Sequence, residues 1–168
     1  IMPVMAGGII QTKFVQVSAG TTHTSASANA TTVVTPLSVS ITPTSASSVI
    51  MIQGFVTGEW SVMGQAWDST WFFLRDSTKL SSPAAGNRNV GIHMGTNVTY
   101  IADEAGTTPE NAYYTYFDSP NSTSAITYKV AFAGNGTATW HLNKTVSDSD
   151  SPNMERGISH IMVQEIAQ

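Results

Sequence analysis

Residues 37–58 read LSVSITPTSASSVIMIQGFVTG, which is the pattern of two β-strands joined by a turn. In LSVSI, at 37–41, apolar residues alternate with serines, and this period of two predicts a strand with one buried face. The polar, proline-marked residues 43–48 predict a tight turn. Residues 49–56 then place apolar side chains on both faces, which predicts a central strand. One face would pack into the core of the chain itself, and the other would need a second sheet or another subunit.

The composition indicates neither a nucleic-acid-binding protein nor a membrane protein. Of the 168 residues only 11% are charged, against about 25% in ordinary soluble proteins, and Ser, Thr and Asn take their place. Such surfaces are typical of extracellular and virion β-proteins. The net charge is −4 and no Lys/Arg cluster occurs, so we expect no nucleic-acid partner. We predict a short N-terminal arm at residues 1–8 and a single β-domain at 9–168.

Several chemistries are excluded by what the sequence lacks. There is no cysteine, so disulfides, zinc–thiolate sites and thiol catalysis are excluded. No apolar run approaches the ~18 residues that span a bilayer, and residues 1–5 lack the charged start of a secretion signal. We therefore expect neither membrane insertion nor export by the secretory route.

The rest of the chain predicts an antiparallel β-sandwich. No segment of ten or more residues shows a helical period. About eight to ten short strands separated by turn signals predict a sandwich, and we expect jelly-roll connections in which the first and last strands pair. Residues 134–136, Gly-Asn-Gly, predict a hairpin turn with positive φ, and the small polar residues 18–32 predict a loop or a solvated edge. Besides the two strands above, the expected strands lie at 9–17, 71–75, 79–80, 90–94, 98–101, 112–118, 126–132, 137–142 and 157–166.

The segments that carry a resemblance are GGIIQTKFVQV (7–17), LSVSITPTSASSVIMIQG (37–54), FFLRDSTKL (72–80), YFDSPNSTSAITYKV (116–130), GTATWHLN (136–143) and ISHIMVQEIA (158–167). Together they resemble a small virion domain of tailed bacteriophages, especially marine ones. The resemblance covers residues 7–167 and leaves 60–68 and 81–111 as variable inserts. It implies a structural protein of the tail fibre, the fibre tip or the capsid decoration, forming a homotrimer that contacts other virion proteins. It implies no active site.

The strongly apolar strands point to the same kind of assembly. Residues 49–56 and 71–74 leave an apolar face that a lone sandwich of this size would struggle to cover, and a symmetric interface would cover it. The expected interface residues are Met51, Phe55, Trp71, Phe73 and His160. The four histidines share no metal-ligand spacing, so we expect no metal or other cofactor. The alternative is an ion held by His160 and its symmetry mates on a threefold axis.

Residues 59–68 predict a loop that holds the best binding candidates. Trp60 and Trp67 lie there with Glu59 and Asp68, and an aromatic face beside hydrogen-bonding groups suits a sugar ring. The alternative is that both rings fill the core or the subunit interface. The two carboxylates could also be drawn as a glycosidase pair. No separation between them follows from the sequence, and no G-x-S-x-G elbow is present, so we expect no enzyme activity.

The leading functional hypothesis is a non-enzymatic surface protein of a phage virion, assembled in the host cytoplasm and extracellular in the particle. The loops at 59–68, 81–89 and 103–111 would meet neighbouring subunits or the host surface, where a glycan is the expected ligand. The arm before residue 9 would dock on the particle. Two other classes stay open, a free carbohydrate-binding module and a small glycan hydrolase.

Overall fold

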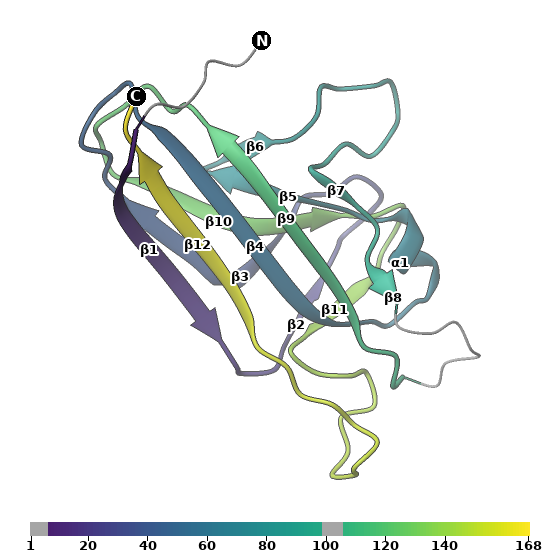
Figure 1. Cartoon of the computed structure of the whole chain (residues 1–168). Helices are drawn as coiled ribbons and strands as arrows, with labels where there is room; N and C mark the ends of the chain where they lie inside the picture. The colour runs from purple at the N-terminus through teal and green to yellow at the C-terminus, as the bar shows by residue number, and fades with distance from the viewer. Residues whose placement is uncertain (1–6, 99–105) are drawn as a thin grey trace.

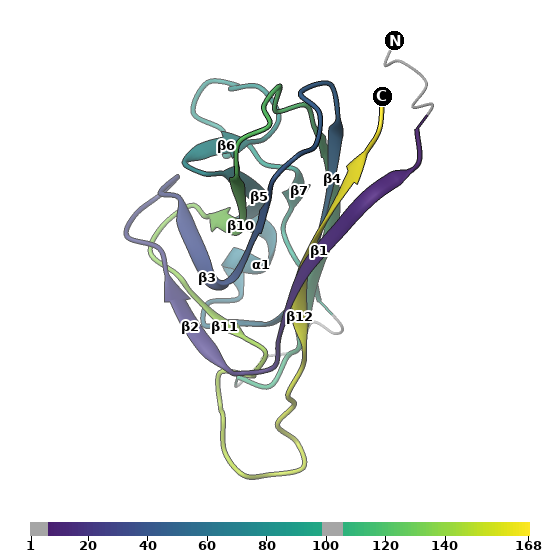
Figure 2. The ribbon, with the colours of Figure 1, turned by 90° about the vertical axis from the view of Figure 1, so that its left-hand side faces the viewer.

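The chain folds into two antiparallel β-sheets packed face to face, as the sequence predicts (Figures 1 and 2). The computed structural model describes residues 7–98 and 106–168. Seven strands form the larger sheet and five form the smaller one. The elements are β1 (Ile9–Val17), β2 (Thr21–Thr24), β3 (Thr32–Ile41), β4 (Val49–Trp60), α1 (Gly64–Asp68), β5 (Thr70–Arg75), β6 (Thr78–Leu80), β7 (His93–Met94), β8 (Asn97–Val98), β9 (Glu110–Asp118), β10 (Ile126–Ala133), β11 (Thr139–Leu142) and β12 (Ser159–Ile166).

The long strands follow the jelly-roll path that the sequence predicts. The larger sheet contains the order β1-β12-β4-β9, and the smaller sheet has the order β3-β10-β5-β6. Strands β1 and β12, the first and last of the chain, pair antiparallel with Phe14 opposite Met162. Over the described residues the chain passes from one sheet to the other six times: between β2 and β3, β3 and β4, β4 and β5, β7 and β8, β9 and β10, and β10 and β11. Each sheet therefore combines strands from distant parts of the sequence, and the core forms between the two sheets (Figure 2).

Strand β4 is central, which confirms the prediction from its two-sided apolar pattern. It pairs with β12 along one edge and with β9 along the other, and β11 continues beside its last residues. The inward side chains of Ile50, Ile52 and Val56 are fully buried. Gly54 interrupts this inward row because the Phe73 ring of the opposite sheet needs the space: a Cβ there would lie 3.0 Å from that ring.

Four large rings hold the two sheets together at one end of the core. Trp60 contacts Trp140 at a centroid distance of 5.1 Å and Phe132 at 4.9 Å, both edge to face. Trp71 contacts Trp140 at 5.1 Å. Edge-to-face pairs of this kind add about 0.5–1.5 kcal/mol each to the burial of the rings. Because the rings come from four strands, the cluster ties distant parts of the chain together.

The prediction of a hairpin turn at residues 134–136 is wrong. Strand β10 before it pairs with β3 and β5, whereas β11 after it pairs with β2 and β4 of the other sheet. The turn is therefore a crossover between sheets, and none of its three residues has a positive φ. Gly134 leaves room for the buried Gln65 side chain, whose Oε1 would have to shift to accommodate a Cβ at this position.

Strand β5 is also covered on both faces, but by this chain alone. Trp71 and Phe73 point inward and are fully buried in the core, so their prediction as subunit-interface residues is wrong. Phe72 and Leu74 point outward and are buried beneath Ile92 and beside other apolar residues. The ammonium of Lys79 lies 3.9 Å from the centroid of the Phe72 ring. The loop after β6 thus does the covering that the sequence assigned to another subunit.

The predicted loops agree with the structure in part. Residues 18–32 include the edge strand β2, in agreement with the solvated edge predicted there as an alternative to a loop, whereas residues 59–68, predicted as a loop, include the end of β4 and the short helix α1. The strand expected at 90–94 shortens to β7. Of the strand expected at 98–101 the structure describes Val98, which belongs to β8; residues 99–101 lie outside the described residues, as do 103–105 of the predicted loop and 1–6 of the arm. In the described part of the chain no helix has the length and apolar character to cross a bilayer.

Candidate functional site

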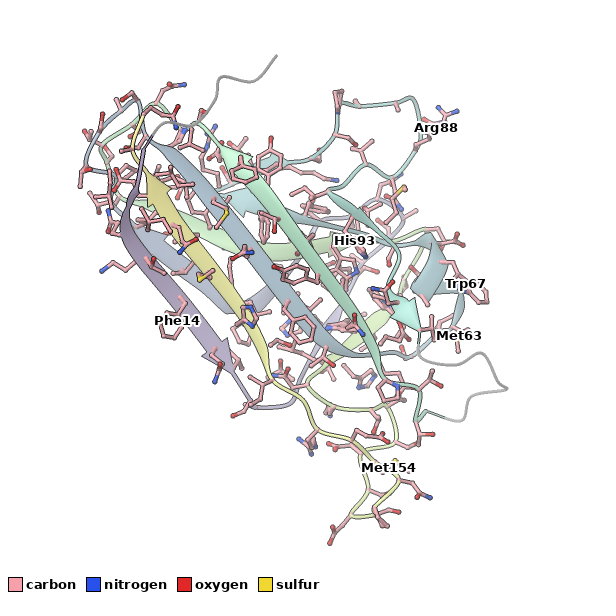
Figure 3. All side chains as sticks on the ribbon, in the orientation of Figure 1. Phe14, Met63, Trp67, Arg88, His93 and Met154 are labelled. Atoms are coloured by element: carbon pink, nitrogen blue, oxygen red, sulfur yellow. The ribbon has the colours of Figure 1, made fainter. Side chains whose placement is uncertain are left out.

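The outer surface of the larger sheet carries an unusual set of side chains. The pairing register of β1, β12, β4 and β9 places twelve outward-pointing residues in three rows of four. None of the twelve is Asp, Glu, Lys or Arg. We call this set the outer face, and it faces the viewer in Figures 1 and 3. The rows are Thr12–Gln164–Met51–Phe117, Phe14–Met162–Gln53–Thr115 and Gln16–His160–Phe55–Tyr113.

Three of the four Phe and Tyr side chains of the outer face are open to solvent, and Phe55 is half-buried. Phe14 is 68% exposed, Tyr113 52% and Phe117 46%. A sheet face that meets water normally carries polar or charged side chains. Here Phe and Met side chains stand among uncharged polar ones, which favours an interaction surface. Of the interface residues that the sequence predicts, Met51, Phe55 and His160 belong to this face.

Contacts within the outer face hold several of its side chains in place. The Phe55 and His160 rings stack with a centroid separation of 5.7 Å. The amide of Gln53 donates a hydrogen bond of 2.8 Å to the hydroxyl of Tyr113. Side chains that are already ordered lose less conformational entropy when a partner covers them.

The predicted sugar-binding loop is divided by the structure into a buried half and an exposed half. Trp60 is 3% exposed and Glu59 is also buried, so neither can contact a sugar, and this part of the prediction is wrong. The reason is that β4 continues as far as Trp60 and carries its ring into the core. Trp67 and Asp68 follow on α1 and remain exposed, with Trp67 at 57%.

Trp67 and Asp68 line a surface pocket of about 540 Å³. Segments that are far apart in the sequence meet there: the loop after β2, the α1–β5 junction, the loop after β6, and the crossover between β10 and β11. Figure 3 shows Trp67 and Arg88 on the side of the molecule away from Phe14. We call this the Trp67 pocket. Its lining residues are Ala28, Asn29, Trp67, Asp68, Ser69, Thr70, Asn87, Arg88, Asn89, Met94 and Asn135.

A relay of amides orients the Asp68 carboxylate. Asn135 donates a hydrogen bond of 2.7 Å from Nδ2 to Oδ2 of Asp68. The buried Gln65 in turn donates from Nε2 to Oδ1 of Asn135. Sequence reasoning missed Asn135 and Arg88 because nothing in a loop sequence tells which distant loop will lie beside it.

Glu59 forms a carboxylate cluster with Glu110, and Asp68 takes no part in it. Both glutamates are buried and line a smaller pocket of about 190 Å³. Glu59 accepts hydrogen bonds from the backbone N–H groups of Thr108, at 3.0 Å, and Val146, at 2.6 Å. Glu110 accepts from the Trp60 N–H at 3.2 Å and from the hydroxyl of Thr96. The glycosidase pair drawn from the sequence, Glu59 with Asp68, is therefore wrong, because the two residues line different pockets.

Burial raises the pKa of Glu110 to about 7. Burial is the largest cause of this net value. The hydrogen bonds from Thr96 and Trp60 lower the pKa of Glu110, and the nearby charge of Glu59 raises it. Backbone N–H groups occupy the Glu59 carboxylate, so this residue ties the loops before β9 and after β11 to the end of β4. The geometry thus favours a role in holding loops together.

Comparison with known proteins finds no family model and no curated protein that matches the chain. Among residues 7–98 and 106–168 no group of three or more His, Asp or Glu side chains is placed to hold a metal ion. The resemblance to phage virion domains remains a prediction. The outer face and the Trp67 pocket are the two features from which a function can be inferred.

Proposed function

We propose that this chain is a non-enzymatic structural protein that associates with copies of itself through the outer face, as a homotrimeric surface component of a tailed-phage particle. It would serve as a tail fibre, a fibre tip or a capsid decoration. The observation that carries the proposal is the outer face, a sheet surface without charged residues and with three exposed aromatic rings, Phe14, Tyr113 and Phe117.

The composition of the outer face suits a second copy of this chain. The centres of stable interfaces are poor in charged residues and rich in aromatic residues and Met. Met51 and Met162 supplement the aromatic rings here, and the polar members of the face are uncharged. A copy of the same face brings no charge that would be left without a counter-ion on burial. In a trimer the contact is heterologous: one edge of the outer face meets the other edge on the next copy, and threefold symmetry closes the ring.

The virion part of the proposal rests on the sequence resemblance and on the composition. Only 11% of residues are charged, and Ser and Thr are abundant. This composition favours a protein that is part of an assembled particle. With the outer face covered, the Trp67 pocket would remain open, because it lies on the side away from Phe14 (Figure 3).

The first test is the mass of the purified chain in solution. Light scattering during size exclusion should give about three times 17.8 kDa at micromolar concentration. A monomer under these conditions would overturn the association. An antibody against the chain should then label the surface of phage particles in electron micrographs, and particles without label would overturn the virion role.

A second candidate function is a free carbohydrate-binding module, which is favoured by the exposed Trp67 beside Asp68. A monomer that binds sugar would select this function. A trimer selects the first.

A further inference from the structure

We propose that the Trp67 pocket binds a neutral sugar residue of a glycan. This site deepens the proposed function, because a particle-surface protein with such a site can attach to glycans on a host. It stands on a different part of the molecule from the outer face, so the two can fail separately. The volume of about 540 Å³ lies within the range of small-ligand sites, roughly 300–1,000 Å³.

Trp67 supplies the stacking surface. The other three tryptophans, at 60, 71 and 140, are buried in the core, and an indole that is 57% exposed stands out against them. More than half of the ring surface is therefore available to a ligand. Its face can accept the C–H groups of a pyranose ring, a contact that combines apolar burial with weak C–H interactions.

Asp68 supplies an oriented hydrogen-bond acceptor next to that surface. The relay from Gln65 through Asn135 fixes the Oδ2 side of the carboxylate. Within the described part of the chain no donor contacts its other oxygen, Oδ1. A carboxylate has about four acceptor positions, so Asp68 retains the capacity to accept hydrogen bonds from two neighbouring sugar hydroxyls.

The pocket wall carries further polar groups. In the described part of the chain, Oγ of the buried Ser69 and Oδ1 of Asn89 have no hydrogen-bond partner, which is rare for buried polar atoms. Both atoms are shielded from solvent, so they can bind a sugar hydroxyl only if their side chains turn toward the pocket. Asn87 adds an exposed amide to the same lining. Carboxylate, amide and hydroxyl groups beside an indole match the alternation of C–H face and hydroxyl rim on a sugar.

The charges of the pocket favour a neutral sugar over an acidic one. Its two ionised side chains are Asp68 and Arg88. Arg88 donates from Nη1 to the carbonyl of Ala85 at 3.1 Å, so its guanidinium is turned toward its own loop. The fixed carboxylate of Asp68 would repel a sugar carboxylate, and the chain as a whole carries a net charge of −4.

The test is a titration of the intact chain with D-glucose, D-galactose, D-mannose, N-acetyl-D-glucosamine and N-acetylneuraminic acid, followed by tryptophan fluorescence. Because Trp67 is the exposed indole, binding of one of the neutral sugars should shift its emission and protect it from iodide quenching. Trp67→Ala should abolish binding as measured by isothermal titration calorimetry, a readout that does not depend on the fluorescence of Trp67. Asp68→Asn should weaken binding by about tenfold or more, as loss of a charge-assisted hydrogen bond predicts.

Val62→Ala provides the control, since Val62 is an exposed apolar residue close in sequence to α1 but absent from the pocket lining. It should leave the affinity unchanged. The site is overturned if no neutral sugar of the panel binds, if Trp67→Ala and Asp68→Asn bind as the wild type does, or if N-acetylneuraminic acid is preferred and Arg88→Ala removes the preference. Loss of sugar binding in a chain that is still a trimer overturns this site alone, and a sugar-binding monomer overturns the association alone.

Discussion

Replacement of Phe14 tests the role of the outer face most directly. Phe14 lies on β1 opposite Met162 and is 68% exposed in the single chain. An aromatic side chain presents roughly 150–250 Å² of surface, so association has up to about 140 Å² of this ring left to bury. At about 25 cal/mol per Å² this corresponds to at most about 3.5 kcal/mol of association free energy for each Phe14 covered. A loss of this size weakens each contact by at most about 370-fold.

Phe14→Thr is the variant of choice, because threonine keeps a high β-propensity on an edge strand. The trimer should dissociate at a protein concentration at which the wild type is still associated, as measured by sedimentation equilibrium over a dilution series. The free energy of unfolding of the isolated chain should change by less than about 1 kcal/mol, since the ring is exposed there.

Val62→Thr is the matched control, an exposed apolar side chain outside the outer face. It should leave the association constant unchanged. Equal dissociation of Phe14→Thr and wild type would refute the assignment of the interface, and a reduced melting temperature of the monomer would refute the view that Phe14 contributes only to association.

Three further predictions concern stability. The pKa of Glu110 is raised by burial to about 7, so its contribution to the free energy of unfolding is complete below pH 4.5 and is lost as the pH rises through 7. In denaturant titrations the wild type should therefore lose at most about 3 kcal/mol of unfolding free energy between pH 5 and 8, and Glu110→Gln should not show this loss. The same pH dependence in both proteins would contradict the prediction. For Glu165, burial is outweighed by hydrogen bonds from Gln11 and Thr44, which lower the pKa to about 2; the stability it provides is present above pH 4.5 and is lost toward pH 2. Glu165→Gln should abolish that acid-dependent step in thermal melts, and the prediction fails if the step persists. Gly134→Ala should cost about 1–3 kcal/mol of unfolding free energy by overpacking, because its Cβ meets Gln65, whereas Gly136→Ala, where a Cβ meets nothing within 4 Å, should be neutral; equal melting temperatures would show that Gln65 moves aside freely.

Local patterns were enough to locate most strands and to orient them. Alternation at 37–41 predicts the buried face of β3, and Leu37, Val39 and Ile41 are indeed buried. The two-sided apolar run at 49–56 predicts a central strand, and β4 has neighbours on both edges. These predictions succeed because alternation and two-sided burial act on consecutive side chains of one strand.

Pairing and environment could not be found in the same way. The Gly-Asn-Gly turn at 134–136 suits a hairpin, yet the strands on its two sides hydrogen-bond to different sheets. Trp60 and Trp67 lie in the same predicted loop, yet the Trp60 ring packs in the core and the Trp67 ring lines a surface pocket. Phe72 and Trp71 differ in which layer covers them, and both are covered by their own chain.

The amino-acid order alone thus establishes an all-β chain, its strand faces and its central strand. The tertiary structure decides which strands pair, which tryptophan is exposed, and that the uncovered apolar surface is the outer face and not β5. The physical reason is range: a strand's faces depend on neighbours two residues apart, whereas its partners and its cover depend on contacts between residues such as Phe14 and Met162, which only the folded chain brings together.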